Sequence, residues 1–257
     1  MSKEINKWAD FWLDREIGVH ECGFVKLIDY MGGDSRVVEA ARCSLGGMSK
    51  PTSSKEDLIQ FLMKHRHLSP FEQTVLTFQI KMPIFVARQL VRYRTGRINE
   101  QSARYSTLPK EFYIPEHLVS KDGVSIDADD ASIVISTMED DQDETARSYE
   151  FYLDLGLARE QARINLPVST YTTMMWQMDL RNLFHFLEQR LSRHAQKEIR
   201  DYADVIGYLT CAVAPLSYAA FTEHVLHSVT LSENEVKNLY TALSEAGLNP
   251  SSFGLGV

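Results

Sequence analysis

The sequence predicts a single α+β domain, in which helices pack around a sheet, and three observations support this. The chain has 257 residues and 44% hydrophobic content, with no linker composition between two halves, so one substantial core is expected. Residues Gln73–Met82 alternate apolar and polar side chains with a period of two, which is typical of a strand. Segments such as Pro83–Tyr93 and Asp179–His194 instead place their apolar residues on one helical face.

The chain is expected to begin with an amphipathic extension over residues 1–22, whose apolar side is formed by Trp8, Phe11 and Trp12. The next segment, Gly23–Gly32, is expected to form the first strand and a turn.

Two helices are expected next, each with a serine or aspartate at its start. Asp34 or Ser35 can accept the first backbone N–H groups of one helix, and Ser53 or Ser54 those of the other. Cys43 lies in an apolar setting near the end of the first helix, so we expect a small buried residue rather than a nucleophile.

The elements that follow the strand Gln73–Met82 alternate between helices, loops and one further strand. In order, we expect a helix at Pro83–Tyr93, an extended piece at Phe112–Pro115, an acidic loop and exposed helix from Lys121 to about Leu155, a short helix at Ala158–Asn165, a strand at Ser169–Met178, a helix at Asp179–His194, core helices at Ala195–Pro215 and Leu216–His227, a helix at Ser232–Ala246, and a loosely ordered tail at Gly247–Val257.

Composition excludes several classes of protein. A net charge of −8 and a pI near 5.5 argue against a general nucleic-acid binder, which would present a broad basic face. Three cysteines without C-x-x-C spacing indicate a reducing cytoplasm, and the charged N-terminus is unlike a signal peptide. Residues Val205–Thr222 lack charge, but Pro215 would break a membrane-spanning helix, so a buried helix pair is expected.

The segment Arg88–Ser106 reverses the overall sign of the charge. It contains five arginines and one acidic residue, Glu100. A guanidinium offers a fixed fork of donors that matches phosphate or carboxylate oxygens. A solvated basic loop is the alternative interpretation.

The flanks of this segment favour an anion pocket over a solvated loop. The helix Pro83–Tyr93 places Arg88, Gln89 and Arg92 on one arc, and Gly96 then permits a sharp turn. The polar residues after this turn would meet the arginines at one place. We expect the anion to be a phosphate.

A second arginine, Arg190, falls within the apolar arc of the helix Asp179–His194, and His194 follows one turn later on the same side. Burying an unpaired guanidinium is costly, and arginine cannot neutralise itself. Either Arg190 forms an ion pair, for instance with Glu188, or it projects into a ligand pocket.

Other patterns indicate chemistry less strongly. Two histidines, His65 and His67, stand near Glu72, but Pro70 makes this segment a turn, so no metal site is expected. Ser102 lacks an adjacent histidine base and suits ligand binding better than nucleophilic attack. The chain contains neither G-x-G-x-x-G nor G-x-x-x-x-G-K-[ST].

Several separated motifs resemble the flavin-dependent thymidylate synthase family. The signature of that family is R-H-R, seven residues and then S, which Arg92-Tyr93-Arg94 and Ser102 match. The middle residue departs from the pattern, because tyrosine stands where histidine is usual. Tyrosine keeps an aromatic face and a polar tip but does not titrate as imidazole does.

Further segments match in the same order, over roughly Gly23 to Leu226. These are Gly23–Gly32, Ala40–Ser44, the H-x-S-P-F-E stretch from His67, the A-R-x-x-L-P stretch around Arg163, and R-x-x-x-H-A-Q from Arg190 to Gln196. The resemblance therefore divides the chain into an N-terminal extension (1–22), the synthase domain (23–230) and a C-terminal helix and tail (231–257).

The resemblance implies the reductive methylation of dUMP to dTMP. Methylenetetrahydrofolate would supply the carbon, and FAD reduced by NADPH would supply the hydride. It also implies an antiparallel, twisted sheet flanked by helices, and a homotetramer whose active sites are shared between subunits.

The resemblance also assigns site residues. Arg190 would be catalytic, because a cation beside the uracil favours its anionic form. The residues expected to bind substrate are Gln89, Arg92, Glu100, Gln101, Ser102, Arg104, Arg163 and Arg190. The residues expected to bind the flavin are His67, Ser69, Arg92, Tyr93, Arg94, Glu100, Asp179, Arg181, His185 and His194.

Two alternatives belong to other classes of protein. A nucleotide-binding regulator without catalysis could use the same arginine pocket. A metal hydrolase could be built from His65, His67, His185 and His194.

Overall fold

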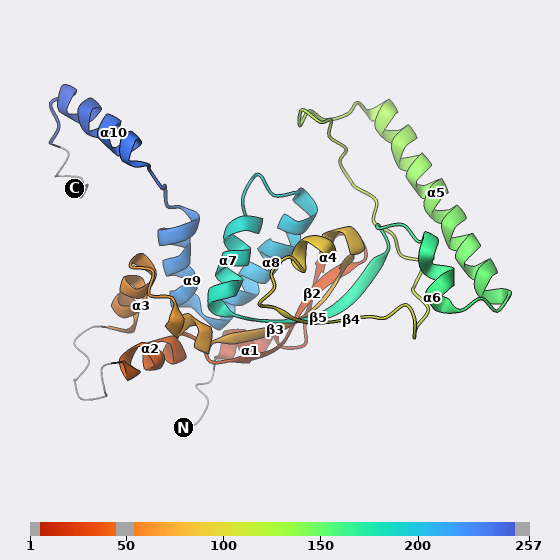
Figure 1. Cartoon of the computed structure of the whole chain (residues 1–257), viewed down its shortest axis with the longest axis horizontal. Helices are drawn as coiled ribbons and strands as arrows, with labels where there is room; N and C mark the ends of the chain where they lie inside the picture. Colours follow the sequence, from red (N-terminus) through yellow and green to blue (C-terminus); the bar gives the residue numbers. More distant parts are fainter. Residues whose placement is uncertain (1–5, 45–53, 250–257) are drawn as a thin grey trace.

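Five strands form one sheet in the order β1-β2-β3-β5-β4, and every neighbouring pair is antiparallel. This computed structural model describes residues 6–44 and 54–249 (Figure 1). The strands are β1 (Glu16–Val19), β2 (Gly23–Met31), β3 (Val75–Pro83), β4 (Arg97–Glu100) and β5 (Tyr171–Asp179). The expected antiparallel sheet in an α+β fold is confirmed.

The central strand β3 shows why the period-two pattern was informative. Leu76, Phe78, Ile80 and Met82 are fully buried, while the alternate residues are only half-buried. Phe78 lies opposite Leu27 of β2 and Trp176 of β5, and all three side chains are buried. One face of the sheet therefore forms the core, and the other face is half-exposed.

The helices are grouped around this sheet. They are α1 (Lys7–Trp12), α2 (Asp34–Cys43), α3 (Lys55–Lys64), α4 (Ile84–Leu90), α5 (Ala128–Asp154), α6 (Arg159–Ala162), α7 (Leu180–Arg190), α8 (Lys197–Val213), α9 (Pro215–Phe221) and α10 (Glu233–Glu245), with short helical turns η1 (Ser69–Gln73), η2 (Arg163–Asn165) and η3 (Thr222–Leu226). Helices α4, α7 and α8 pack on the sheet, whereas α5 and α6 project to one side and α10 to the other (Figure 1).

The expected pair of buried helices is confirmed as α8 and α9, which meet at Ala214 and Pro215. No helix in the described part of the chain is long and apolar enough to cross a membrane.

Asp34 was expected to cap its own helix, but α2 begins after Gly33 without a side-chain cap. The Asp34 carboxylate instead accepts hydrogen bonds from the backbone N–H groups of Leu216 (2.8 Å) and Ser217 (2.9 Å), so it caps α9.

The N-terminal segment differs from the expectation. Residues 16–19 form β1 and pair with β2, so the sheet begins before residue 23. In α1, Ala9 is the buried residue, while Trp8 and Phe11 remain exposed. Cys43 is exposed rather than buried, because it lies in the last turn of α2.

Two helix starts are confirmed and one helix end is not. Ser54 and Ser232 both form capping boxes at the starts of α3 and α10. Helix α7 ends at Arg190, so His194 lies beyond it rather than one turn further on the same face. The alternative cap Ser53 and residues 250–257 of the expected tail lie outside the described residues.

Gly23 at the start of β2 provides a stability prediction. A Cβ at this position would lie 2.0 Å from Tyr202 Oη, 2.6 Å from the Val19 carbonyl oxygen and 2.9 Å from the Lys81 carbonyl oxygen. The tyrosine hydroxyl cannot yield easily, because it donates a hydrogen bond to the Lys81 carbonyl at 2.9 Å. We expect Gly23→Ala to lower the free energy of unfolding by about 2–3 kcal/mol, measured by urea denaturation at one protein concentration.

Gly18 in the adjoining strand β1 is the matched control. A Cβ there would meet no atom within 4 Å, so Gly18→Ala should change stability by less than about 0.5 kcal/mol. Equal losses in the two variants would show that close packing at Gly23 is not the cause.

Candidate functional site

An open cavity of about 640 Å³ lies between α4 and α7, and it is lined by Arg88, Gln89, Val91, Arg92, Arg94, Gln189 and Arg190. We call it the α4–α7 cavity. Four of these seven residues are arginines and none is acidic. The cavity therefore concentrates positive charge in a protein whose net charge is −8, and it suits an anionic ligand.

Arg190, the last residue of α7, is held in this cavity without an acidic partner among the described residues. Its Nε is buried and has no hydrogen-bond partner within that part of the chain. Its Nη2 lies 3.5 Å from the Gln89 carbonyl oxygen, which is a weak hydrogen bond. The ion pair with Glu188 is not formed, because that carboxylate instead lies 3.8 Å from Nδ1 of His185.

Tyr93 forms the inner side of the site. Its hydroxyl donates a hydrogen bond of 2.8 Å to Oε1 of Gln189, and its ring meets Phe186 edge-on at 5.0 Å. The guanidinium carbon of Arg190 lies 5.4 Å from the centre of the Tyr93 ring. Burial raises the pKa of Tyr93 above its usual value, while the charge and hydrogen bonding of Arg190 act in the opposite direction.

Gln89 closes another side of the cavity. Its Nε2 donates a hydrogen bond of 2.6 Å to Oε1 of Gln196, which follows α7. Gln89, Arg92, Arg94 and Arg190 from the predicted set thus line one cavity. The reason is that Gln89 of α4 lies within hydrogen-bonding distance of Arg190 at the end of α7 and of Gln196 beyond it.

The other predicted substrate residues lie at the end of the edge strand β4 and in the segments that follow. Glu100 ends the edge strand β4 and accepts a hydrogen bond of 2.8 Å from the Thr172 hydroxyl. The backbone N–H of Gln101 donates to the Thr173 carbonyl at 2.8 Å. The Ser102 hydroxyl accepts a hydrogen bond from the Arg104 backbone N–H at 3.3 Å.

Helix α6 provides a contact for one of these residues after β4. Arg104 Nε donates to Oε2 of Glu160 in α6 at 2.7 Å, and Arg163 follows in η2. We call Ser102, Arg104 and Arg163 the β4–α6 group. None of these three residues lines the α4–α7 cavity. One chain therefore presents the predicted arginines in two separate groups.

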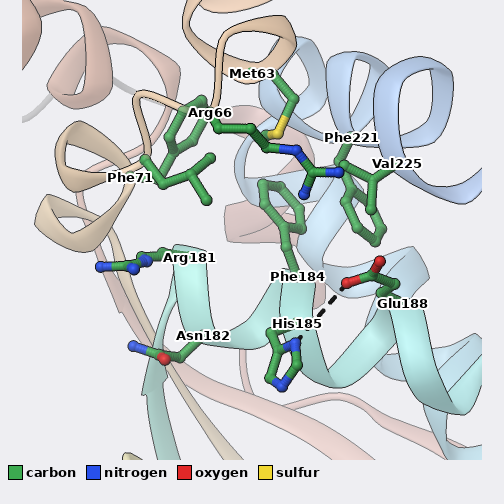
Figure 2. Close-up of a pocket in the computed structure, with 11 residues that line it drawn as sticks. Met63, Arg66, Phe71, Arg181, Asn182, Phe184, His185, Glu188, Phe221 and Val225 are labelled. Carbon is green, nitrogen blue, oxygen red and sulfur yellow. Dashed lines mark ion pairs between the residues drawn. The ribbon is translucent and has the colours of Figure 1, made fainter. Parts of the chain in front are cut away.

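A second, smaller cavity of about 260 Å³ lies between the end of α3 and α7, and we call it the α3–α7 cavity (Figure 2). It is lined by Met63, Arg66, Leu68, Phe71, Arg181, Asn182, Phe184, His185, Glu188, Phe221 and Val225. Figure 2 shows Arg66 above the phenyl rings, with Arg181, Asn182 and His185 along the α7 side. Aromatic faces and cationic groups thus share one cavity.

Of the predicted flavin-binding residues, two line the α3–α7 cavity directly. His185 lines the cavity next to Glu188. Arg181 lines the cavity and also forms an ion pair with Glu72. His67 and Ser69 lie just before Phe71, another lining residue, and His67 is exposed.

Asp179 and His194 do not line either cavity described above. Asp179 is the N-cap of α7, and its carboxylate accepts hydrogen bonds from the backbone N–H (3.0 Å) and the side-chain amide (2.7 Å) of Asn182. His194 is exposed in the turn after α7.

The histidines are not arranged as one cluster. The rings of His65 and His67 lie 6.3 Å apart, while His185 lies on α7 and His194 follows it. Among the described residues, no group of three or more His, Cys, Asp or Glu side chains is placed to hold a metal ion.

The structure adds residues to those that the sequence analysis assigned to ligands. Arg88, which the sequence analysis placed on one arc with Gln89 and Arg92 without giving it a ligand, lines the α4–α7 cavity. Gln189 and Arg66 could not have been found in this way, because their positions depend on contacts between α7 and distant segments.

The fold and the two cavities define an α+β protein with an arginine-lined cavity beside a cavity of aromatic and cationic side chains. A family model described as "Thymidylate synthase complementing protein" matches residues 26–216. The flavin-dependent thymidylate synthase of Treponema denticola is 46% identical over 235 residues, covering 88% of each chain. An enzyme of the same name from Thermus thermophilus is 43% identical over 248 residues, covering 93% of this chain and 91% of the relative.

Solved structures agree with these matches. The UMP/dUMP methylase PolB from Streptomyces cacaoi, bound with 5-Br dUMP, superposes with a TM-score of 0.76 at 34% identity, covering 83% of this chain and all of the other. Its complex with 5-Br UMP gives a TM-score of 0.75. The chain therefore belongs to the flavin-dependent thymidylate synthase family, and it is an enzyme of that class.

Proposed function

We propose that this enzyme methylates dUMP reductively to dTMP, with methylenetetrahydrofolate as the carbon donor and NADPH-reduced FAD as the hydride source. One observation carries the proposal: Arg190 places a guanidinium with a buried, unpartnered Nε in a cavity rich in arginine and free of acid. A positive charge that the described part of the chain leaves unneutralised suits an anionic ligand. The printed names of the relatives, and a structural neighbour bound with 5-Br dUMP, support a pyrimidine nucleotide as that ligand.

The proposed substrate residues divide by the chemistry that each can provide. Guanidinium groups of Arg92, Arg104 and Arg163 match the oxygens of the nucleotide phosphate. Ser102 and Gln101 offer a hydroxyl and an amide for further hydrogen bonds. Arg190 would lie beside the uracil, and Gln89 would contact the nucleotide from α4.

These residues can act on one nucleotide only if two groups meet. The β4–α6 group and the α4–α7 cavity lie apart within one chain. We therefore propose a homotetramer in which the β4–α6 group of one subunit completes the α4–α7 cavity of another. Glu100, at the end of the edge strand, would lie at this junction.

The residues around the α3–α7 cavity fit a flavin dinucleotide. Such a cofactor combines flat ring systems with a diphosphate, so it requires aromatic faces and cationic donors. Phe184 and Phe221 provide the aromatic faces, and Arg66 and Arg181 provide the cationic donors. When bound, the flavin supplies the hydride for the reduction.

Further flavin contacts are proposed for His67, Ser69, His185 and for the two exposed arginines Arg92 and Arg94. The side chains of Tyr93 and Asp179 are already engaged, with Gln189 and Asn182 respectively. We therefore assign to these two a role in orienting neighbouring residues. His194 would contact the cofactor from the exposed turn after α7.

The chain's own contribution to the reaction is electrostatic. The net change at the uracil replaces the C5 hydrogen by a methyl group. Because C5 donates the electron pair of the new bond to the carbon donor, negative charge must develop on the ring before that bond forms. Arg190 is a fixed cation, and a positioned cation stabilises such charge more in the transition state than in the ground state. The arginines that bind the phosphate fix the uracil relative to Arg190.

The purified enzyme tests this function directly. We expect releasable FAD, oxidation of NADPH that depends on dUMP, and formation of dTMP when methylenetetrahydrofolate is supplied. Formation of dTMP is measured by chromatography, and omission of each component in turn is the control. A protein that binds dUMP but forms no dTMP would instead be a nucleotide-binding regulator, and the proposal would be wrong.

A further inference from the structure

Tyr93 and Gln189 form a hydrogen-bonded pair directly beneath Arg190. They are 96 residues apart in sequence, and the distance from the Tyr93 hydroxyl to Oε1 of Gln189 is 2.8 Å. Tyr93 is only 8% exposed, and Phe186 packs edge-on against its ring at 82°. The ring therefore cannot shift without losing both the hydrogen bond and the aromatic contact.

The amide of Gln189 is oriented from both ends. Its Oε1 accepts from Tyr93, so its Nε2 must act as the donor towards Nε2 of His185, which lies 3.3 Å away. This assigns the neutral imidazole proton to Nδ1, on the side where Glu188 lies at 3.8 Å. The Tyr93–Gln189 pair thus has one consistent direction of hydrogen bonding.

Arg190 lies over the Tyr93 ring of this pair without being neutralised. Its guanidinium carbon lies 5.4 Å from the centre of the Tyr93 ring, and no described acidic residue forms an ion pair with it. A carboxylate in the same place would cancel the positive charge that the ligand needs, whereas an aromatic face attracts the cation and leaves that charge in place. Burial raises the pKa of Tyr93, so the phenol stays neutral and keeps its proton for Gln189.

We propose that the Tyr93–Gln189 pair is a positioning device that fixes the Arg190 guanidinium at the uracil end of the α4–α7 cavity. This role rests on the proposed function, and neither residue contacts the reacting atoms. Tyrosine serves here where the family signature usually has histidine, because a neutral phenol can both lie beneath a cation and donate to Gln189.

The test compares Tyr93→Phe, Gln189→Leu and the double variant in the flavin-loaded enzyme. Loss of the hydrogen bond should lower kcat about 3- to 10-fold in each single variant. The double variant should be no slower than the slower single one, because both changes remove the Tyr93–Gln189 hydrogen bond and Gln189→Leu alone already removes the contact with His185. The Kd of dUMP, measured by calorimetry, should change less than about 2-fold, because the phosphate contacts remain.

Two further variants separate positioning from stability. Tyr93→Leu also removes the aromatic face and should lower kcat by about 30-fold or more. Tyr30→Phe is the matched control, because the buried Tyr30 likewise donates a hydrogen bond, of 2.6 Å, to Asp10. It should lower the Tm as Tyr93→Phe does, yet leave kcat unchanged.

The outcomes distinguish this role from the function itself. A wild type that forms no dTMP overturns the proposed function, and this role with it. A wild type that forms dTMP, with unchanged kcat in Tyr93→Phe or with strictly additive losses in the double variant, overturns the positioning role alone. Gln189 is exposed, so Gln189→Leu should fold and give a clear result even if the Tyr93 variants do not.

Discussion

Replacing Arg190 by alanine is expected to lower kcat about 100- to 1,000-fold while changing the Kd of dUMP by no more than about 3-fold. In the proposed function, the nucleotide phosphate is bound by other arginines, whereas Arg190 acts on charge that develops in the uracil only during the reaction. Its buried Nε and its position above Tyr93 fix the guanidinium before the substrate arrives. Steady-state kinetics and calorimetry of dUMP binding measure the two quantities separately.

Arg193→Ala is the matched control for this variant. Arg193 follows α7 by three residues and is exposed, so its loss changes the net charge equally but removes no group from the cavity. It should retain wild-type kcat. If Arg190→Ala instead weakened dUMP binding as much as it slowed turnover, Arg190 would be a simple binding residue.

The second prediction concerns two variants that are inactive alone and active together. Arg92→Ala alters the α4–α7 cavity, and Arg104→Ala alters the β4–α6 group. If each site combines these parts from two subunits, co-expressed variants form some sites in which both parts are intact. Random assembly gives about one quarter of the wild-type sites, so activity should return to about 25% of wild type.

A pair from the same group provides the control for this experiment. Arg92 and Arg190 both line the α4–α7 cavity, so co-expressed Arg92→Ala and Arg190→Ala should show no recovery. Recovery in the control, or none in the test pair, would contradict a site shared between subunits. Size-exclusion chromatography with light scattering checks that each variant assembles as the wild type does.

Local features of the fold were predictable because they depend on neighbouring residues. The alternation along β3 requires only that one face of a strand be buried, and the capping boxes of Ser54 and Ser232 each join residues only three positions apart. The arginines at positions 88, 92 and 94 lie within one helix and its following turn, so their convergence was also visible from spacing.

Features that join distant segments were not predictable from the sequence. Asp34 caps α9 by accepting a hydrogen bond from Leu216, 182 residues later, whereas local preference placed it on its own helix. Gly96 was expected to permit a turn through its backbone freedom. The structure instead requires glycine there because a Cβ would lie 2.4 Å from Trp176 Nε1 of β5.

The sequence by itself determined the class of the protein and most of the side chains that we propose for the nucleotide site, because motif residues and their periodicity are local properties. Only the tertiary structure decided how those side chains are divided. Arg92 and Arg190 line one cavity, whereas Arg104 forms an ion pair with Glu160 of α6. Tyr93 and Gln189 form a hydrogen-bonded pair beneath Arg190. These relations arise because α4 and α7 pack on one sheet while α6 lies to its side with Glu160 beside Arg104, and no spacing along the chain encodes them.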